Sequence, residues 1–182
     1  MLRTRGEFRQ RTLRLSDMTY NVLFLCTGNS ARSIIAEALL GTLGKERVVA
    51  YSAGSCPSGS VQPLAAELAA QLGYPPEKLR SKNWDEYATD DAPKMDFIIT
   101  VCDNAAGEVC PVWPGQPISA HWGVPDPAAV EGDDERRRAA FRDAYATLRR
   151  RIELLLALPL DKLDRLAHER ELRMIAADAT GT

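Results

Sequence analysis

The sequence predicts an α/β fold built on a parallel sheet. Strand-like, mostly apolar segments occur at residues 22–25, 48–52, 97–101 and 118–122, and segments with a helical spacing of apolar residues lie between and after them. Nearly continuous apolar strands that alternate with helices favour a parallel sheet covered on both faces. Ligands of such sheets bind beyond the carboxyl ends of the strands. The residues that follow each strand are therefore the first candidates for a functional site.

Three helical segments are expected in the first half of the chain. From Ser33 the apolar residues follow a helical spacing, and Gly41 or Gly44 would end that helix. A second helix is expected over residues 64–72, before a Gly and a Pro-Pro pair. Residues 79–87 predict a loop that runs into one short helical turn.

The second half of the chain is expected to contain a long loop and two helices. Residues 103–115 are rich in Gly and Pro, which predicts a long mobile loop. Residues 134–158 predict a long helix with one apolar face, and Pro159 interrupts it. Residues 161–177 predict a final helix, whose many charges place it on the surface.

Composition predicts one globular domain. The chain has 182 residues, of which 45% are hydrophobic and 26% charged, and a net charge of -2, which argues against bulk binding of nucleic acid. It lacks the apolar run of about 18 to 20 residues that spans a membrane, and its first residues lack the apolar core of a secretory signal. We expect residues 1–19 to form a flexible basic arm, residues 20–158 the catalytic domain, and residues 159–182 a helical extension.

The four cysteines indicate a cytoplasmic protein with working thiols. Cys26, Cys56, Cys102 and Cys110 are too few for the disulfide framework of a secreted protein of this length.

The most informative segment joins the first strand to the first helix. It begins at Cys26, and after five residues it reaches Arg32 and Ser33. Gly28 and Asn29 tolerate the backbone angles of a tight loop, whose N–H groups and following helix favour an anion. Arg32 offers a planar fork to two oxygens of a tetrahedral anion, and the same positive field is expected to lower the pKa of Cys26. The alternative is that Cys26 is a small buried hydrophobic residue. The expected oxyanion-binding residues are Thr27, Gly28, Asn29, Ser30, Ala31 and Arg32.

Two further cysteines suggest thiol–disulfide exchange. Cys102 follows the third strand, so it is expected at the same sheet edge as Cys26, and Cys110 follows after seven residues. A flexible loop of that length can bring two sulfurs to bonding distance, which would support a relay. The alternatives are inert buried thiols, or a metal site of Cys102, Cys110 and His121 that has only three ligands.

Two carboxylates complete the set of candidates. Asp126 precedes a proline in the loop after the fourth strand, where it could protonate a leaving oxygen or simply form a turn. Glu37 lies four residues after Ser33 on one helix face, where it could orient the anion loop, help hold a cation or remain a solvated surface residue.

These motifs resemble a known superfamily. Residues 26–33 are similar to the phosphate loop of the low-molecular-weight tyrosine phosphatases. The segment from Cys102 to Cys110, followed by residues 121–123 and Asp126, resembles the arsenate reductases built on that fold. The resemblance covers about residues 20–158. It implies three layers, with a four-stranded parallel sheet flanked by helices.

The resemblance also implies a mechanism for the attack on arsenate. Phosphate and sulfate are expected to bind as analogues of arsenate. The Cys26 thiolate attacks arsenate held by the loop amides and Arg32. Ser33 stabilises that thiolate through a hydrogen bond, and Asp126 protonates the departing oxygen.

The resemblance further implies a relay. Cys102 attacks the Cys26 sulfur, arsenite leaves, and Cys110 then attacks Cys102 and frees Cys26. The electrons come from an external reductant, thioredoxin or glutaredoxin with glutathione, so no tightly bound cofactor is expected and no membrane or nucleic-acid partner is implied.

Some members hold a potassium ion near the loop, and the matching positions here are Asn29, Glu37, Ser52 and Asp85.

The sequence departs from this pattern in three places. The segment between Cys102 and Cys110 is one residue longer than in the thioredoxin-coupled reductases, and Cys56 has no place in the relay. Two alanines follow Asp126-Pro127 where phosphatases commonly have tyrosines. Two alternative functions stay open, a tyrosine phosphatase and a redox-sensing protein that binds a partner.

Overall fold

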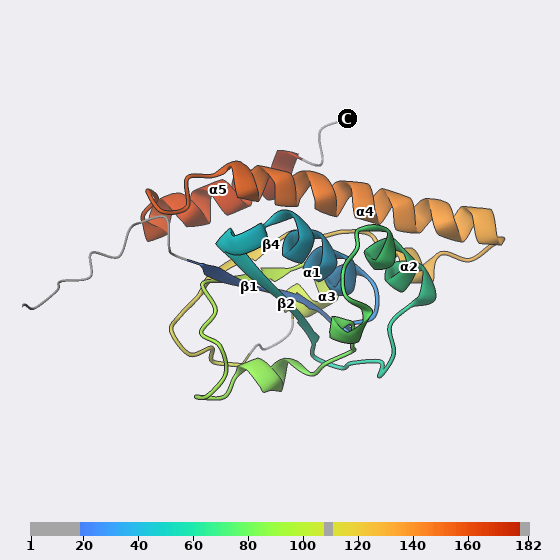
Figure 1. The fold of residues 1–182 in the computed structure, drawn as a ribbon, viewed down its shortest axis with the longest axis horizontal. Helices are drawn as coiled ribbons and strands as arrows, with labels where there is room; N and C mark the ends of the chain where they lie inside the picture. The colour runs from blue at the N-terminus through green and yellow to red at the C-terminus, as the bar shows by residue number, and fades with distance from the viewer. Residues whose placement is uncertain (1–18, 108–110, 179–182) are drawn as a thin grey trace, which may run out of the picture.

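The computed structural model describes residues 19–107 and 111–178. Its four strands form one sheet in the order β2-β1-β3-β4, and every pairing is parallel (Figure 1). The fold class predicted from the sequence is therefore confirmed. The strands are β1 (Tyr20–Cys26), β2 (Val48–Gly54), β3 (Phe97–Thr100) and β4 (Ile118–His121).

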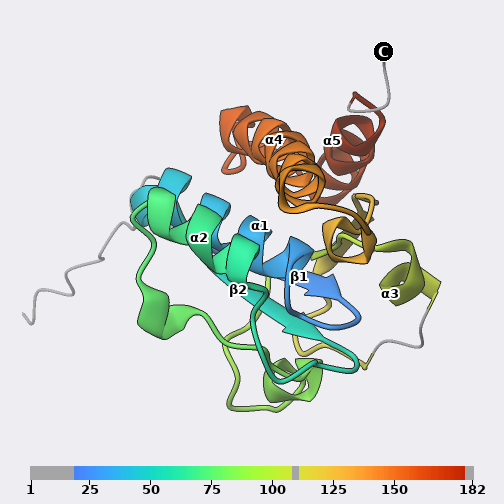
Figure 2. The ribbon, with the colours of Figure 1, turned by 90° about the vertical axis from the view of Figure 1, so that its right-hand side faces the viewer.

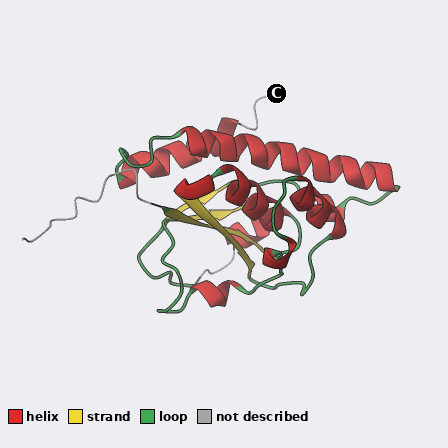
Figure 3. Ribbon diagram, viewed as in Figure 1, coloured by secondary structure: helices red, strands yellow, loops and turns green. Residues whose placement is uncertain are grey.

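The longer helices gather on one face of the sheet. Figure 2 shows α1, α2, α4 and α5 stacked on that side, and Figure 3 shows how far the longest of them, α4, extends along the molecule. These helices are α1 (Arg32–Leu43), α2 (Pro63–Gln71), α4 (Asp134–Ala157) and α5 (Arg165–Asp178). The shorter ones are α3 (Asp103–Gly107), η2 (Lys45–Arg47), η3 (Pro76–Lys78), η4 (Trp84–Tyr87) and η5 (Pro127–Ala129).

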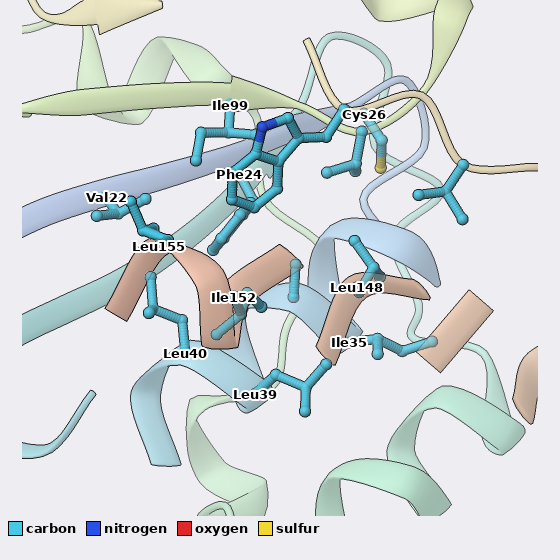
Figure 4. Close-up of a cluster of buried hydrophobic side chains, with 14 of the residues drawn as sticks. Val22, Phe24, Cys26, Ile35, Leu39, Leu40, Ile99, Leu148, Ile152 and Leu155 are labelled. Carbon is cyan, nitrogen blue, oxygen red and sulfur yellow. The ribbon is translucent and has the colours of Figure 1, made fainter. Parts of the chain in front are cut away.

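The alternation of side chains along β1 explains the core. Val22, Phe24 and Cys26 join the larger cluster on the helix side, where Leu148 and Ile152 of α4 pack (Figure 4). The other face carries a smaller cluster covered by aromatic side chains of η4 and neighbouring loops. Its buried members are Leu23, Leu25, Ala53, Trp84, Met95 and Ile98. Because β1 is buried on both faces, its sequence is a continuous apolar run.

Two expectations for the second half of the chain, one for a loop and one for the start of a helix, are wrong. The segment predicted as a loop after Cys102 begins with helix α3, whose first turn is capped because the Ala105 N–H donates to Cys102 Sγ at 3.4 Å. The last helix begins at Arg165 rather than residue 161, because Asp164 caps it by accepting from the Ala167 N–H at 2.8 Å.

Helix α5 is attached to the loop that follows β4. The Trp122 indole N–H donates to the carbonyl of Leu172 at 3.1 Å, and the Trp122 side chain is fully buried. Buried Arg151 of α4 donates to Gly123 and to Ala176 of α5 at 3.1 and 3.3 Å. These bonds fix the chain directly before Asp126.

The expected basic arm lies outside the described residues, apart from Thr19. Among the residues that are described, no helix combines the length and apolar character needed to cross a lipid bilayer.

Candidate active site

The candidate site forms at the carboxyl edge of the two central strands. Strand β1 ends at Cys26, the loop turns through residues 27–31, and α1 begins at Arg32. Strand β3, the neighbour of β1, leads to Cys102. The strand order changes direction between β1 and β3, and this switch point is the usual ligand-binding position in such sheets.

Cys26 is buried and hydrogen bonded. Its Sγ accepts from the Asn29 N–H at 3.2 Å and lies 2.9 Å from Ser33 Oγ. Burial raises the pKa of the Cys26 thiol, while the hydrogen bonds of Ser33 and Asn29 act in the opposite direction. The predicted lowering of this pKa is therefore wrong, because desolvation of the sulfur has the larger effect.

Removing the Ser33 hydroxyl should raise the pKa of Cys26 further. Ser33→Ala deletes a bond that stabilises the thiolate, so the midpoint of Cys26 alkylation should move to higher pH. The rate of iodoacetamide labelling of the Cys26 peptide, followed by mass spectrometry across pH, measures this shift. Ser119→Ala, at an exposed position of β4, is the matched control, and an unchanged midpoint in Ser33→Ala would contradict the role assigned to the hydroxyl.

The loop conformation depends on Asn29. Its φ of 41° lies in the left-handed region, which asparagine tolerates better than most residues. Its buried side chain donates to Ser33 and Ser52, each at 2.9 Å, and accepts from the Lys82 N–H at 2.7 Å. These bonds connect the loop to β2 and to the chain before η4.

Gly54 ends β2 where the loop passes closest. A Cβ atom at Gly54 would lie 2.3 Å from the Thr27 carbonyl oxygen and 2.9 Å from the Asn29 nitrogen, so only glycine fits.

Gly54→Ala should therefore displace the loop and weaken anion binding. Overpacking of this kind costs about 1–3 kcal/mol, which corresponds to roughly fivefold to 160-fold in affinity when the displaced backbone is the binding element. Calorimetric titration with phosphate measures the loss. Gly107→Ala, where a Cβ meets open space, is the control, and equal phosphate affinity in Gly54→Ala and the unsubstituted chain would refute the close-packing argument.

Arg32 and Asp126 meet at the rim of the loop. The Arg32 Nη2 atom lies 3.0 Å from Asp126 Oδ2, and Nη1 donates to the Val124 carbonyl at 3.0 Å. The Asp126 side chain is 42% exposed, and its other oxygen accepts from the Ala128 N–H at 3.1 Å. A carboxyl group thus lies beside the guanidinium that is expected to bind the anion.

Cys102 also lies next to the loop. It is buried, and its Sγ is 3.7 Å from the Thr27 hydroxyl. Cys110 lies outside the described residues. The Cys56 side chain is exposed. The Cys56 backbone N–H donates to the Thr27 carbonyl at 3.0 Å, so the backbone of Cys56 contacts the loop.

His121 has partners other than cysteine. Its Nδ1 lies 2.8 Å from the Thr100 hydroxyl, and its Nε2 lies 2.9 Å from Asp103 Oδ1. Over residues 19–107 and 111–178, no group of three or more His, Cys, Asp or Glu side chains is placed to hold a metal ion.

The residues expected around potassium are only partly brought together. Glu37 is buried, which excludes a solvated surface position, and it accepts a hydrogen bond from Ser52. Asp85 is exposed on η4. The nearest cation to Glu37 is instead the Lys82 ammonium, 3.1 Å from its Oε2. Sequence reasoning missed Lys82, because a lysine before a helical turn carries no pattern that distinguishes it from a surface residue.

Comparisons with known proteins agree with this arrangement. Residues 21–170 match the low molecular weight phosphotyrosine protein phosphatase family. The arsenate reductase of Halalkalibacterium halodurans is 38% identical over 133 residues, which are 72% of this chain and 91% of that protein.

Two solved structures share the fold. The arsenate reductase of Archaeoglobus fulgidus superposes with a TM-score of 0.58 at 29% identity, covering 75% of this chain and 99% of that one. The thioredoxin-dependent arsenate reductase of Corynebacterium glutamicum superposes with a TM-score of 0.52 at 29% identity, covering 77% and 65%. The chain is similar to proteins named as arsenate reductases, and it belongs to the low molecular weight phosphotyrosine protein phosphatase family.

Proposed function

We propose that this chain reduces arsenate to arsenite through a thiol relay. The observation that carries the proposal is the position of a second buried thiol, Cys102, beside the anion loop that holds Cys26. A hydrolytic phosphatase needs only the first of these thiols. The names of the similar proteins support the same activity.

The first half of the reaction uses the loop and the rim. Arsenate binds to the loop amides and the Arg32 guanidinium, and the Cys26 thiolate attacks arsenic. One oxygen leaves as water after Asp126 supplies a proton. The product is an arsenate bonded to Cys26 through sulfur.

The second half of the reaction supplies two electrons. The Cys102 thiolate attacks Cys26 Sγ, and the sulfur–arsenic bond breaks with its electron pair on arsenic, which leaves as arsenite. The Cys26–Cys102 disulfide is then attacked by the Cys110 thiolate, which frees Cys26 and forms a Cys102–Cys110 disulfide. An external dithiol, or glutathione, reduces that disulfide.

Two donors fit this scheme, thioredoxin and glutaredoxin with glutathione. One solved structure similar to this chain is named as thioredoxin-dependent. We place the activity in the cytoplasm, where such donors are kept reduced.

Arsenate-dependent oxidation of NADPH tests the proposal. The assay is run with thioredoxin and its reductase, and in parallel with glutathione, glutaredoxin and glutathione reductase. Turnover in either system supports the proposal and identifies the donor. The absence of turnover in both, from a chain that binds phosphate, would refute it.

A phosphatase is the second candidate, favoured by the arrangement of Cys26, Arg32 and Asp126 alone. It predicts strong hydrolysis of p-nitrophenyl phosphate, at a rate that does not change when Cys102 and Cys110 are replaced by serine.

A further inference from the structure

A lysine and a glutamate form an ion pair inside the protein. The side chains of Lys82 and Glu37 are only 4% and 6% exposed, and Lys82 Nζ lies 3.1 Å from Glu37 Oε2. Removing two charges from water is costly, so a pair of this kind is weak evidence for a gain in stability. Its position relative to the anion loop suggests a different role.

The pair belongs to a closed ring of contacts that includes the loop. The Lys82 backbone N–H donates to Asn29 Oδ1 at 2.7 Å, and the Asn29 amide donates to Ser52 Oγ at 2.9 Å. The Ser52 hydroxyl donates to Glu37, whose carboxylate faces the Lys82 ammonium. Lys82 thus holds Asn29 directly through its backbone and indirectly through its side chain.

The ring is connected to the nucleophile. The Asn29 amide also donates to Ser33 Oγ at 2.9 Å, which leaves the Ser33 proton free to donate to Cys26 Sγ, 2.9 Å away. A continuous series of buried polar contacts therefore runs from the Lys82 ammonium to the Cys26 sulfur.

These residues do not fit the potassium site that the sequence resemblance implies. Glu37 Oε2 already accepts hydrogen bonds from the Lys82 ammonium and the Ser52 hydroxyl, and Oε1 accepts one from the Tyr74 hydroxyl at 2.9 Å. The side-chain oxygen of Asn29, Oδ1, accepts from the Lys82 backbone N–H. A potassium ion here would have to share the Glu37 carboxylate with the Lys82 ammonium, and the two cations at contact distance would repel each other.

We propose that Lys82 is a positioning residue whose ammonium serves as a built-in cation for the anion loop. The ammonium neutralises the charge of the Glu37 carboxylate. The resulting ion pair keeps Ser52 and Asn29 in the orientation that holds the loop. Binding of the anion is then independent of potassium. The inference deepens the proposed function but concerns anion binding and thiol reactivity, which are measurable without arsenate reduction.

Lys82→Ala tests the proposal, because it removes the ammonium and leaves room beside Glu37. Phosphate affinity is measured by calorimetry in potassium chloride and in choline chloride at equal ionic strength, with the rate of Cys26 alkylation as a second readout. The unsubstituted chain should give the same values in both salts. The variant should lose about tenfold or more in affinity in choline and recover most of it in potassium.

Two further variants sharpen the test. Adding Glu37→Gln to Lys82→Ala removes the carboxylate that would hold potassium, so the recovery should disappear. Lys94→Ala, at an exposed lysine, is the control and should match the unsubstituted chain in both salts.

Three results would overturn the proposal: potassium-dependent phosphate binding by the unsubstituted chain, unchanged affinity in Lys82→Ala, or a loss that potassium does not restore. Should Lys82→Ala fail to fold, Lys82→Met keeps the length of the side chain, and phosphate affinity equal to that of the unsubstituted chain would then refute the role. A chain that shows the expected salt pattern but reduces no arsenate would refute the proposed function alone.

Discussion

Replacing Cys26 with serine is expected to abolish arsenate reduction, with a loss of at least about 1,000-fold in kcat. A hydroxyl is a far weaker nucleophile than a thiolate at neutral pH, so the sulfur–arsenic bond cannot form. The loop, Arg32 and Asp126 remain, and Cys26→Ser should therefore still bind phosphate. Steady-state NADPH oxidation and calorimetry measure the two properties separately.

Cys56→Ser is the matched control for this experiment. Cys56 is exposed and contacts the loop through its backbone N–H, which serine also has, so turnover should stay within about twofold of the unsubstituted chain. Comparable loss of activity in both variants would contradict the assignment of Cys26 as the nucleophile that attacks arsenate.

Cys102→Ser should stop multiple turnover while leaving the first chemical step intact. Cys26 can still bond to arsenic, but the attack that releases arsenite then depends on a thiol from solution. An intramolecular thiol has a high effective concentration, so its loss should lower the steady-state rate by at least about 100-fold. Hydrolysis of p-nitrophenyl phosphate, which needs only Cys26, Arg32 and Asp126, should be largely retained.

The ratio of these two activities discriminates between the functions. Arsenate turnover that persists in Cys102→Ser would exclude the relay. Equal losses of both activities would indicate that the substitution damages the loop, which Cys102 approaches through Thr27.

The parallel sheet could be predicted from the sequence because β1 and β3 are buried on both faces. That environment requires apolar residues at every position, and such runs are visible without any structure. Cys26, Arg32 and Asp126 could be placed at one sheet edge by the same reasoning, since residues after parallel strands share that edge.

The features that the sequence could not predict depend on tertiary contacts. The raised pKa of Cys26 follows from the burial of its side chain in the larger core cluster, which no local sequence pattern reports. The role that we propose for Lys82 depends on its contact with a glutamate 45 residues away in the sequence. Helix α3 is short and capped by a cysteine, and its Gly-rich surroundings are typical of loops.

Trapping of the first disulfide tests the relay most directly. Cys110→Ser, reduced and then treated with arsenate in the absence of any other thiol, should release one arsenite per chain. Quenching with N-ethylmaleimide and peptide mapping should then show a Cys26–Cys102 disulfide, with Cys56 alkylated. Release of arsenite with Cys26 and Cys102 both alkylated, or a disulfide that joins Cys26 to Cys56, would contradict the account.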